Sequence, residues 1–310
     1  TLWATSRRVL GFAPQQLAVL KALAQRVGGL LDRAAGDKED AIKERVIREL
    51  EGISKTQTGE HLGILPADSG FDAVGRCRSM CEVGGDLCEL IPLGEGRTLV
   101  AVGDACGHSV QAAFVMTAVR SAMRAVIDDG VSNHLDPTDV VARINRALCL
   151  VTAGHQFMSC LVGIIDRKRM VFDYANAGHP VPILYRQGSG VALESHGLPL
   201  GIMTDATYSS GEVPLRGDDL LVLFSDGVLE TMNDEQELFR SEGVMAALSE
   251  TAIVDPLEEV LGRIWDSCEQ HGGGTAQDDR TLLVLRMQQN QNPRRPHHAI
   301  VPRKVAISSR

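Results

Sequence analysis

The stretch TLVAVGDACGH, residues 98–108, places Asp104 directly after an apolar run and before a turn that contains glycine. The run predicts a buried strand, and a charged side chain rarely enters a protein interior without a partner. An aspartate beside glycine or a second acid recurs at three other apolar runs: VGGDLCEL with Asp86, LLVLFSDGVLE with Asp226 and AQDDRTLLVLR with Asp278. Acids at the mouths of buried strands predict a centre for a divalent cation that neutralises them.

The donor types indicate which metal such a centre would take. Asp104 and Asp226 each end an apolar strand, and Gly227 permits a sharp turn and a close backbone approach that a Cβ would obstruct. Asp278 and Asp279 come directly before the last strand. Carboxylates without a nearby cluster of His and Cys predict Mg²⁺ or Mn²⁺ rather than zinc. A single Asp-Gly pair is usually only a turn, so the prediction depends on their joint occurrence.

Length and composition are those of a globular protein. The chain has 310 residues, of which 44% are hydrophobic and 23% charged, enough apolar material for one large domain with appendages. Its formal net charge of -9 argues against general nucleic-acid binding, which needs a basic face. A protein or a small molecule is therefore the expected partner.

Cysteine usage predicts a reducing compartment and hence a cytoplasmic location. Seven cysteines are an odd number in a chain too large to need disulfide staples. Zinc binding by Cys77, Cys81 and Cys88 is the weaker interpretation of that cluster, because it lacks a CxxC pair. No run reaches the roughly eighteen apolar residues of a membrane span. The start at Thr1 rather than Met indicates a piece of a longer protein.

Two amphipathic helices are expected in the N-terminal part of the chain. Residues 14–32 carry apolar side chains at alternating three- and four-residue spacing. A second helix starts near Asp37, with Leu50 and Ile53 on its apolar stripe. The stripes pair with each other or with a second copy of the chain, or equally pack on the domain that follows. We predict a regulatory linker over residues 37–65 and a homodimer.

From about residue 66 the sequence changes to short strand-like runs separated by glycine and proline. The expected strands are 98–102, 157–166, 170–175, 181–185, 219–224 and 281–286, and the expected helices are 109–128, 138–150 and 256–270. Strands and helices cluster rather than alternate strictly, which favours an α+β layered sandwich over a doubly wound parallel sheet. Residues 288–310 are expected to form a disordered basic tail.

Six short motifs in a fixed order carry a resemblance to a known family. They are GGD (84–86), GDACGH (103–108), NAGHP (176–180), GLPLGI (197–202), SDGVLE (225–230) and DDRT (278–281). Over residues 66–287 the sequence resembles the metal-dependent PPM protein phosphatases, in the SpoIIE branch of sporulation and bacterial stress-response phosphatases. The resemblance implies an α-β-β-α sandwich. Residues 7–32 resemble the closing helix of a GAF domain, which implies that residues 1–36 end an upstream sensor.

The same resemblance implies roles for the acids. Asp104, with the Ala105 carbonyl, matches the acid that bridges two Mn²⁺ or Mg²⁺ ions. Asp226 and Asp278 match further ligands of the first ion, and Asp86 matches the acid that holds metal-bound waters. Asp86 and Asp104 are therefore the catalytic candidates. The family's reaction is direct in-line attack on phosphorus by metal-bound water, without a phosphoenzyme.

Two positions depart from the family pattern. Where the family usually has two aromatic residues and an aspartate after the GGD motif, this chain has Leu87, Cys88 and Glu89. Glu89 thus replaces an acid, and an aromatic wall is lost. Ser109 stands where a second glycine is common, and its hydroxyl is suited to cap the helix that follows.

Four polar residues near the motifs are further candidates for a role at the site. Asp279 and His108 are candidates for a second shell around the metals, with His108 either donating to phosphate or stabilising a turn. His179 lies among turn-forming residues, which favours a structural role. Arg280 either binds phosphate or is an exposed arginine at a strand start, and the second interpretation is favoured.

These observations lead to one main hypothesis and two alternatives. The main one is a Mn²⁺/Mg²⁺-dependent serine/threonine phosphatase acting on a phosphorylated bacterial signalling protein, for which the family implies an anti-sigma-factor antagonist. The first alternative is a catalytically silent scaffold of the same fold that binds a phosphoprotein, although retention of all four acids argues against it. A two-metal nuclease fits the carboxylates but not the acidic charge balance.

Overall fold

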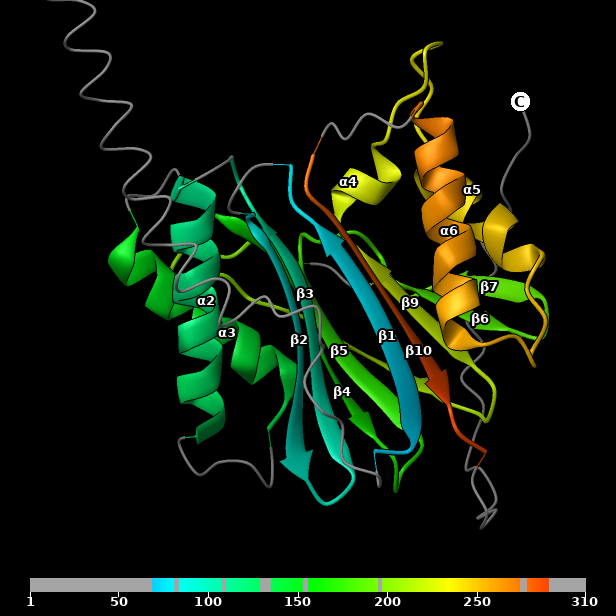
Figure 1. Ribbon diagram of the computed structural model, residues 1–310. Helices are drawn as coiled ribbons and strands as arrows, with labels where there is room; N and C mark the ends of the chain where they lie inside the picture. The colour runs from blue at the N-terminus through cyan, green and yellow to red at the C-terminus, as the bar shows by residue number, and fades with distance from the viewer. Residues whose placement is uncertain are drawn as a thin grey trace, which may run out of the picture. The chain divides into compact units, whose positions relative to one another are not determined.

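The computed structural model describes residues 69–80, 84–107, 110–128, 135–152, 156–194, 197–273 and 278–289. Two five-stranded antiparallel sheets lie face to face, with helices on their outer sides (Figure 1). The expected N-terminal helices, the GAF-like segment and residues 290–310 of the expected tail lie outside the described residues.

Each sheet combines strands that are distant in sequence. The first sheet has the order β1 (Phe71–Arg78), β10 (Arg280–Met287), β9 (Leu220–Phe224), β6 (Ile183–Arg186) and β7 (Ser189–Ala192). The second has the order β2 (Asp86–Gly94), β3 (Arg97–Ala105), β4 (Met158–Asp166), β5 (Val171–Ala177) and β8 (Ser210–Pro214). Every neighbouring pair is antiparallel.

Helices cover the outer face of each sheet. In Figure 1, α2 (Val110–Asp128) and α3 (Pro137–Val151) flank the second sheet, while α5 (Arg240–Ser249) and α6 (Leu257–His271) flank the first. The short helix α4 (Asp226–Leu229) follows β9. The result is an α-β-β-α sandwich, which confirms the expected fold class. None of the helices that the structure describes has the length and apolar character needed to cross a membrane.

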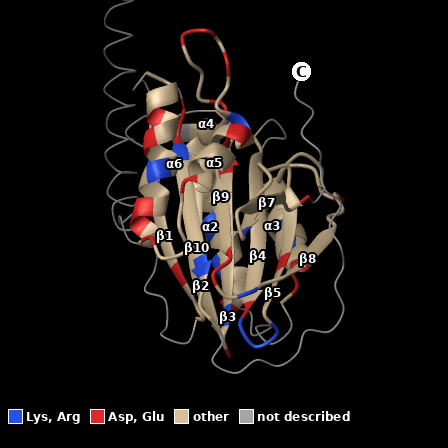
Figure 2. Cartoon of the chain, turned by 90° about the vertical axis from the view of Figure 1, so that its right-hand side faces the viewer, with Lys and Arg blue, Asp and Glu red and all other residues tan. Residues whose placement is uncertain are grey.

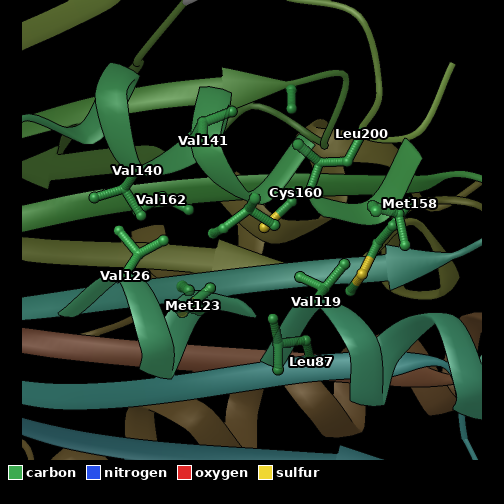
Figure 3. Packing of buried hydrophobic residues seen from close by; sticks show 14 of the residues in the cluster. Leu87, Val119, Met123, Val126, Val140, Val141, Met158, Cys160, Val162 and Leu200 are labelled. Atoms are coloured by element: carbon green, nitrogen blue, oxygen red, sulfur yellow. The ribbon is translucent and has the colours of Figure 1, made fainter. Parts of the chain in front are cut away.

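Local sequence explains why α3 begins where it does. The side chain of Asp136 accepts a hydrogen bond of 2.8 Å from the Thr138 amide, and Pro137 occupies the first helical turn. Val140 and Ile144 are then fully buried on one helical face. Figure 3 shows this face meeting the α2 side chains and the strand residues beneath them.

Side-chain alternation along the strands separates two kinds of core. In β3, Leu99 and Ala101 belong to the cluster under α2 and α3, whereas Val100 and Val102 belong to the core between the two sheets. A strand residue two positions beyond Val102 therefore points between the sheets as well. That residue is Asp104.

Candidate metal centre and cavity

Strand register puts two acids and one hydroxyl in a row at one end of the sandwich. Asp86 of β2 lies opposite Asp104 of β3, and Asp104 lies opposite Ser159 of β4. Directly opposed residues of an antiparallel pair project from the same face of the sheet. That face also holds Val102 and the rest of the core between the sheets. The side chains of Asp86, Asp104 and Ser159 therefore point between the two sheets, at the end of the sandwich.

The first sheet supplies acids to the same end. Asp226 is the first residue of α4, two residues after the end of β9, and Asp278 comes two residues before β10. Since β9 and β10 are antiparallel neighbours, the end of one lies beside the start of the other. Burial raises the pKa of Asp104 to about 7, with the negative charges of Asp226 and Asp278 as further causes. The predicted acids from the two sheets are therefore close enough to repel one another electrostatically.

Asp86 is held by hydroxyl groups from the opposite sheet. Its Oδ2 accepts hydrogen bonds of 2.9 Å from the Ser225 hydroxyl and 2.6 Å from the Thr281 hydroxyl. The Oδ1 atom is buried without a hydrogen-bond partner. Burial, together with the nearby charge of Asp104, raises the pKa of Asp86 well above its ordinary value. One oxygen of this carboxylate is thus fixed in place while the other has no protein donor.

The Asp279 carboxylate accepts hydrogen bonds from two backbone amides. One carboxylate oxygen accepts a hydrogen bond of 2.7 Å from the Met80 amide, and the other accepts one of 2.7 Å from the Gly85 amide. These bonds tie the connection between β1 and β2 to the start of β10. Asp279 thereby supports the segment that carries Asp86.

The close approach expected behind Asp226 is confirmed. A Cβ added to Gly227 would lie 2.0 Å from the backbone oxygen of Asp279, a distance that no side-chain carbon tolerates. Gly227 therefore lets the start of α4 lie against the segment that leads into β10. This contact keeps Asp226 beside Asp278.

A cavity of about 390 Å³ opens between these elements. Asp104, Asp226 and Glu230 contribute carboxylates to its lining. The remaining lining residues are Cys106, Phe157, Ser159, Gly178, His179, Pro180 and Pro199. Figure 2 shows acidic residues around α4, the helix that carries Asp226 into this wall.

His179 lies on the side of the cavity formed by β4 and the end of β5. Its Nδ1 is 2.8 Å from the Ser159 hydroxyl, while Nε2 is buried with no partner in hydrogen-bonding geometry. Burial lowers the pKa of His179 to about 3, and the neighbouring Phe224 backbone only partly offsets this effect. The imidazole is consequently neutral at physiological pH.

The residues at this end of the sandwich fit hard divalent cations. The donors are carboxylate oxygens, and the Oδ1 atoms of Asp86 and Asp226 are both buried without a hydrogen-bond partner. Buried carboxylates without partners are costly unless a cation neutralises them, and oxygen donors suit Mg²⁺ and Mn²⁺. In the described part of the chain, no three Asp, Glu, His or Cys side chains are close enough to form a closed metal cluster. The acids are grouped at one end of the sandwich without being drawn together as ligands of one ion.

Other expected positions have different outcomes. His108 and Ser109 lie outside the described residues. The Ala105 carbonyl lies against Gly85, whose added Cβ would be 3.2 Å from that oxygen. Glu89 does not face the cavity, because it pairs with Arg120 of α2 at 2.8 Å and also with Arg124. It anchors α2 to β2.

The expectation that Arg280 is an exposed arginine is wrong. Its side chain is buried, with only 2% of the residue exposed. Along β10 it shares the side of Leu282 and Val284, which pack under α5 and α6, so it points away from the cavity. The first residue of a strand is usually expected to be exposed when only the sequence is known. Here α6 covers the sheet as far as the start of β10, so Arg280 is buried.

Sequence reasoning missed four polar residues at the site: Ser159, Ser225, Glu230 and Thr281. Ser225 and Thr281 stand within the SDGVLE and DDRT motifs, where their position next to the acids was the available indication. Ser159 carries no such mark in the sequence. Only the pairing of β3 with β4 places it beside Asp104.

The comparison with protein families identifies the domain. The model described as Stage II sporulation protein E (SpoIIE) matches residues 94–288, more than half of the chain. The chain belongs to the SpoIIE family. In this SpoIIE-family chain the matched segment contains Asp104, Asp226 and Asp278, while Asp86 precedes it.

The chain is similar in sequence to a protein named as a phosphatase and in structure to a related pair of domains. The chain is 30% identical over 189 residues to phosphoserine phosphatase RsbU of Bacillus subtilis, a match that covers 60% of the chain and 55% of RsbU. The RsbU and RsbW domains of Rv1364c from Mycobacterium tuberculosis align with a TM-score of 0.58 at 26% identity, over 72% of this chain and 63% of that one. The chain thus spans about half the length of RsbU.

Two further structures show the fold alone. The SiaA-PP2C domain of Pseudomonas aeruginosa aligns with a TM-score of 0.62 at 22% identity, over 86% of this chain and 98% of that domain. RsbX in complex with magnesium aligns with a TM-score of 0.54 at 14% identity, over 70% of this chain and 96% of RsbX. The sandwich of this SpoIIE-family chain is therefore the PP2C phosphatase fold.

The electrostatics of Asp104 give a first testable prediction. Its pKa in the folded state is about 7, against 3.8 for the ordinary carboxyl, so the folded protein binds this proton more tightly than the unfolded chain. This tighter proton binding adds to the free energy of unfolding. The added stability is present in full below about pH 3.8 and is lost as the pH rises towards about 7. In EDTA we expect the melting temperature of the wild type to fall more steeply between about pH 4 and about pH 7 than that of Asp104→Asn. Parallel pH profiles of the two proteins would contradict the assignment.

Proposed function

We propose that this chain is a Mn²⁺- or Mg²⁺-dependent serine/threonine protein phosphatase that hydrolyses a phosphorylated bacterial signalling protein. The observation that carries the proposal is the meeting of acids from both sheets at one end of the sandwich, beside a cavity, with carboxylate oxygens buried and unpaired. Family membership and the phosphoserine phosphatase RsbU as a relative support it. The magnesium complex of RsbX supports the choice of a hard cation.

The proposal gives each acid a task. Asp104, with the Ala105 carbonyl, and Asp226 with Asp278 would hold two cations. When bound, the cations would supply an activated water and offset negative charge on the phosphoryl oxygens. Asp86 keeps one oxygen fixed by Ser225 and Thr281 and offers the other as an acceptor that orients water. The cavity beside Asp104 and Asp226 has room for a phosphorylated side chain.

The proposal extends to the substrate, the domain organisation and the location of the protein. We propose an anti-sigma-factor antagonist as the phosphoprotein substrate, since RsbU and the RsbU and RsbW domains of Rv1364c are relatives. We further propose a GAF sensor end over 1–36, a linker over 37–65, the phosphatase domain over 66–287 and a tail over 288–310. A homodimer formed through the linker and a cytoplasmic location complete the proposal, and the free thiols among the described cysteines agree with a reducing compartment.

A comparison of two substrates tests the activity. With Mn²⁺ we expect turnover of an aryl phosphate monoester, none of the corresponding diester, and loss of activity in EDTA. The silent-scaffold alternative predicts binding of a phosphopeptide without release of phosphate. Preferential hydrolysis of the diester would instead favour the nuclease hypothesis and would overturn the proposal.

A further inference from the structure

Ser159 and His179 meet at the cavity wall, outside the set of acids. Ser159 lies in register with Asp104, on the same face of the second sheet. Its hydroxyl is 2.8 Å from Nδ1 of His179, and both residues line the cavity that Asp104 and Asp226 also line. The proposed phosphatase chemistry, as assigned to the acids, uses neither of them.

The loop that carries His179 is built to hold the imidazole in one place. The Asn176 side chain donates a hydrogen bond of 2.8 Å to the His179 carbonyl and accepts one of 2.7 Å from the His179 amide. Gly178 has a φ of +71°, and a Cβ there would lie 2.7 Å from the Pro199 ring. His179 itself is only 5% exposed. The side chain is therefore fixed and buried, and its Nε2 has no hydrogen-bond partner. A turn by itself does not require an imidazole to be held in this way.

The cavity needs a donor for an anion. Cations would balance the carboxylates, but a phosphoryl group also has oxygens that need hydrogen-bond donors. Among the described residues that line the cavity there is no Lys or Arg. Ser159 supplies a hydroxyl there, directly beside Asp104. A neutral imidazole that carries its proton on Nδ1 donates to the Ser159 oxygen, adds no charge, and leaves the serine O–H as a donor for the phosphoryl group.

We infer that Ser159 binds the phosphoryl group of the substrate and that His179 is a positioning residue that orients the Ser159 hydroxyl. The inference deepens the proposed function and rests on it, because the bound group is the substrate of that same site. It gives His179 a role different from the structural one that the sequence favoured.

Three serine variants test the inference. We expect Ser159→Ala to lower kcat/KM for an aryl phosphate, and the affinity for inorganic phosphate, by about tenfold to a hundredfold, as for loss of a hydrogen bond to a charged group. The affinity for Mn²⁺ should be unchanged. Ser159→Thr keeps the hydroxyl and should stay within about threefold of the wild type. Ser189→Ala, on the exposed edge strand β7, is the matched control and should change nothing.

A double-mutant cycle tests the positioning role. Because His179 acts through Ser159, His179→Asn should lose a similar factor, and the double variant should be no worse than Ser159→Ala alone. Additive losses, or a Ser159→Ala variant with wild-type kcat/KM and wild-type phosphate affinity, would overturn the inference. If His179→Asn does not fold, the pair Ser159→Ala and Ser159→Thr still decides whether the hydroxyl binds phosphate.

Phosphate binding separates this inference from the proposed function. Calorimetry with inorganic phosphate and the Mn²⁺-loaded protein needs no turnover. If the wild type is inactive yet binds phosphate and Ser159→Ala does not, the proposed function fails and the anion site stands. If the wild type is active but both proteins bind phosphate equally, the proposed function stands and the role of Ser159 fails.

Discussion

Replacing Asp104 or Asp226 by Asn is expected to abolish Mn²⁺-dependent phosphate release, with a loss in kcat/KM on the order of a thousandfold or more. Each substitution removes a negative charge and keeps the side-chain volume, so the fold should survive. In the absence of metal the variants should even be relieved of repulsion, since the charges of Asp226 and Asp278 oppose that of Asp104. Steady-state kinetics at saturating Mn²⁺, together with thermal melting in EDTA, measure both effects.

Asp266→Asn is the matched control for these two variants. Asp266 is exposed on α6 and lies outside the motifs, so its replacement should leave kcat/KM and melting temperature unchanged. Wild-type turnover by Asp104→Asn or Asp226→Asn at saturating Mn²⁺ would show that the cation does not depend on these carboxylates. An unfolded variant would be visible in the melting curve and would not be counted as a loss of chemistry.

The strands that sequence analysis predicted are the ones in the middle of the sheets. β3, β4, β9 and β10 are buried at nearly every position, because a sheet covered on both faces buries both sides of its central strands. The four strands that it missed are the sheet edges: β1, β2, β7 and β8. Edge strands such as SGEVP and FDAVGRCR mix polar and small residues, which reads as loop in a single sequence.

The acids of the site were predictable and their supporting residues were not. A carboxylate at the mouth of an apolar run is conspicuous because burial of a lone charge is costly. A serine within a strand, such as Ser159, is unremarkable until the register with Asp104 is known. The acids of β2 and β3 also meet those beside β9 and β10 only because the sheets stack, a relation between segments more than a hundred residues apart that no local pattern encodes.

Replacing Gly227 by Ala is expected to damage both activity and stability through one contact. The new Cβ would lie 2.0 Å from the Asp279 backbone oxygen and 3.3 Å from the Asp278 side chain, so one of the two segments must move. Movement would separate Asp226 from Asp278 and disturb the Asp279 bonds that support the segment of Asp86. We expect kcat/KM to fall by about a hundredfold or more and the free energy of unfolding to fall by about 1–3 kcal/mol.

Gly262→Ala is the control for this prediction because it makes the same chemical change without the contact. Gly262 lies within α6, and an added Cβ there would meet no atom within 4 Å. Since alanine favours a helix over glycine by up to about 1 kcal/mol, this variant should be slightly more stable than the wild type and fully active. Urea unfolding and aryl phosphate kinetics on both variants give the comparison. If Gly227→Ala behaved like Gly262→Ala, the tight approach of α4 to the start of β10 would not be what holds Asp226 and Asp278 together, and the acids would have to be positioned by the sheet register alone.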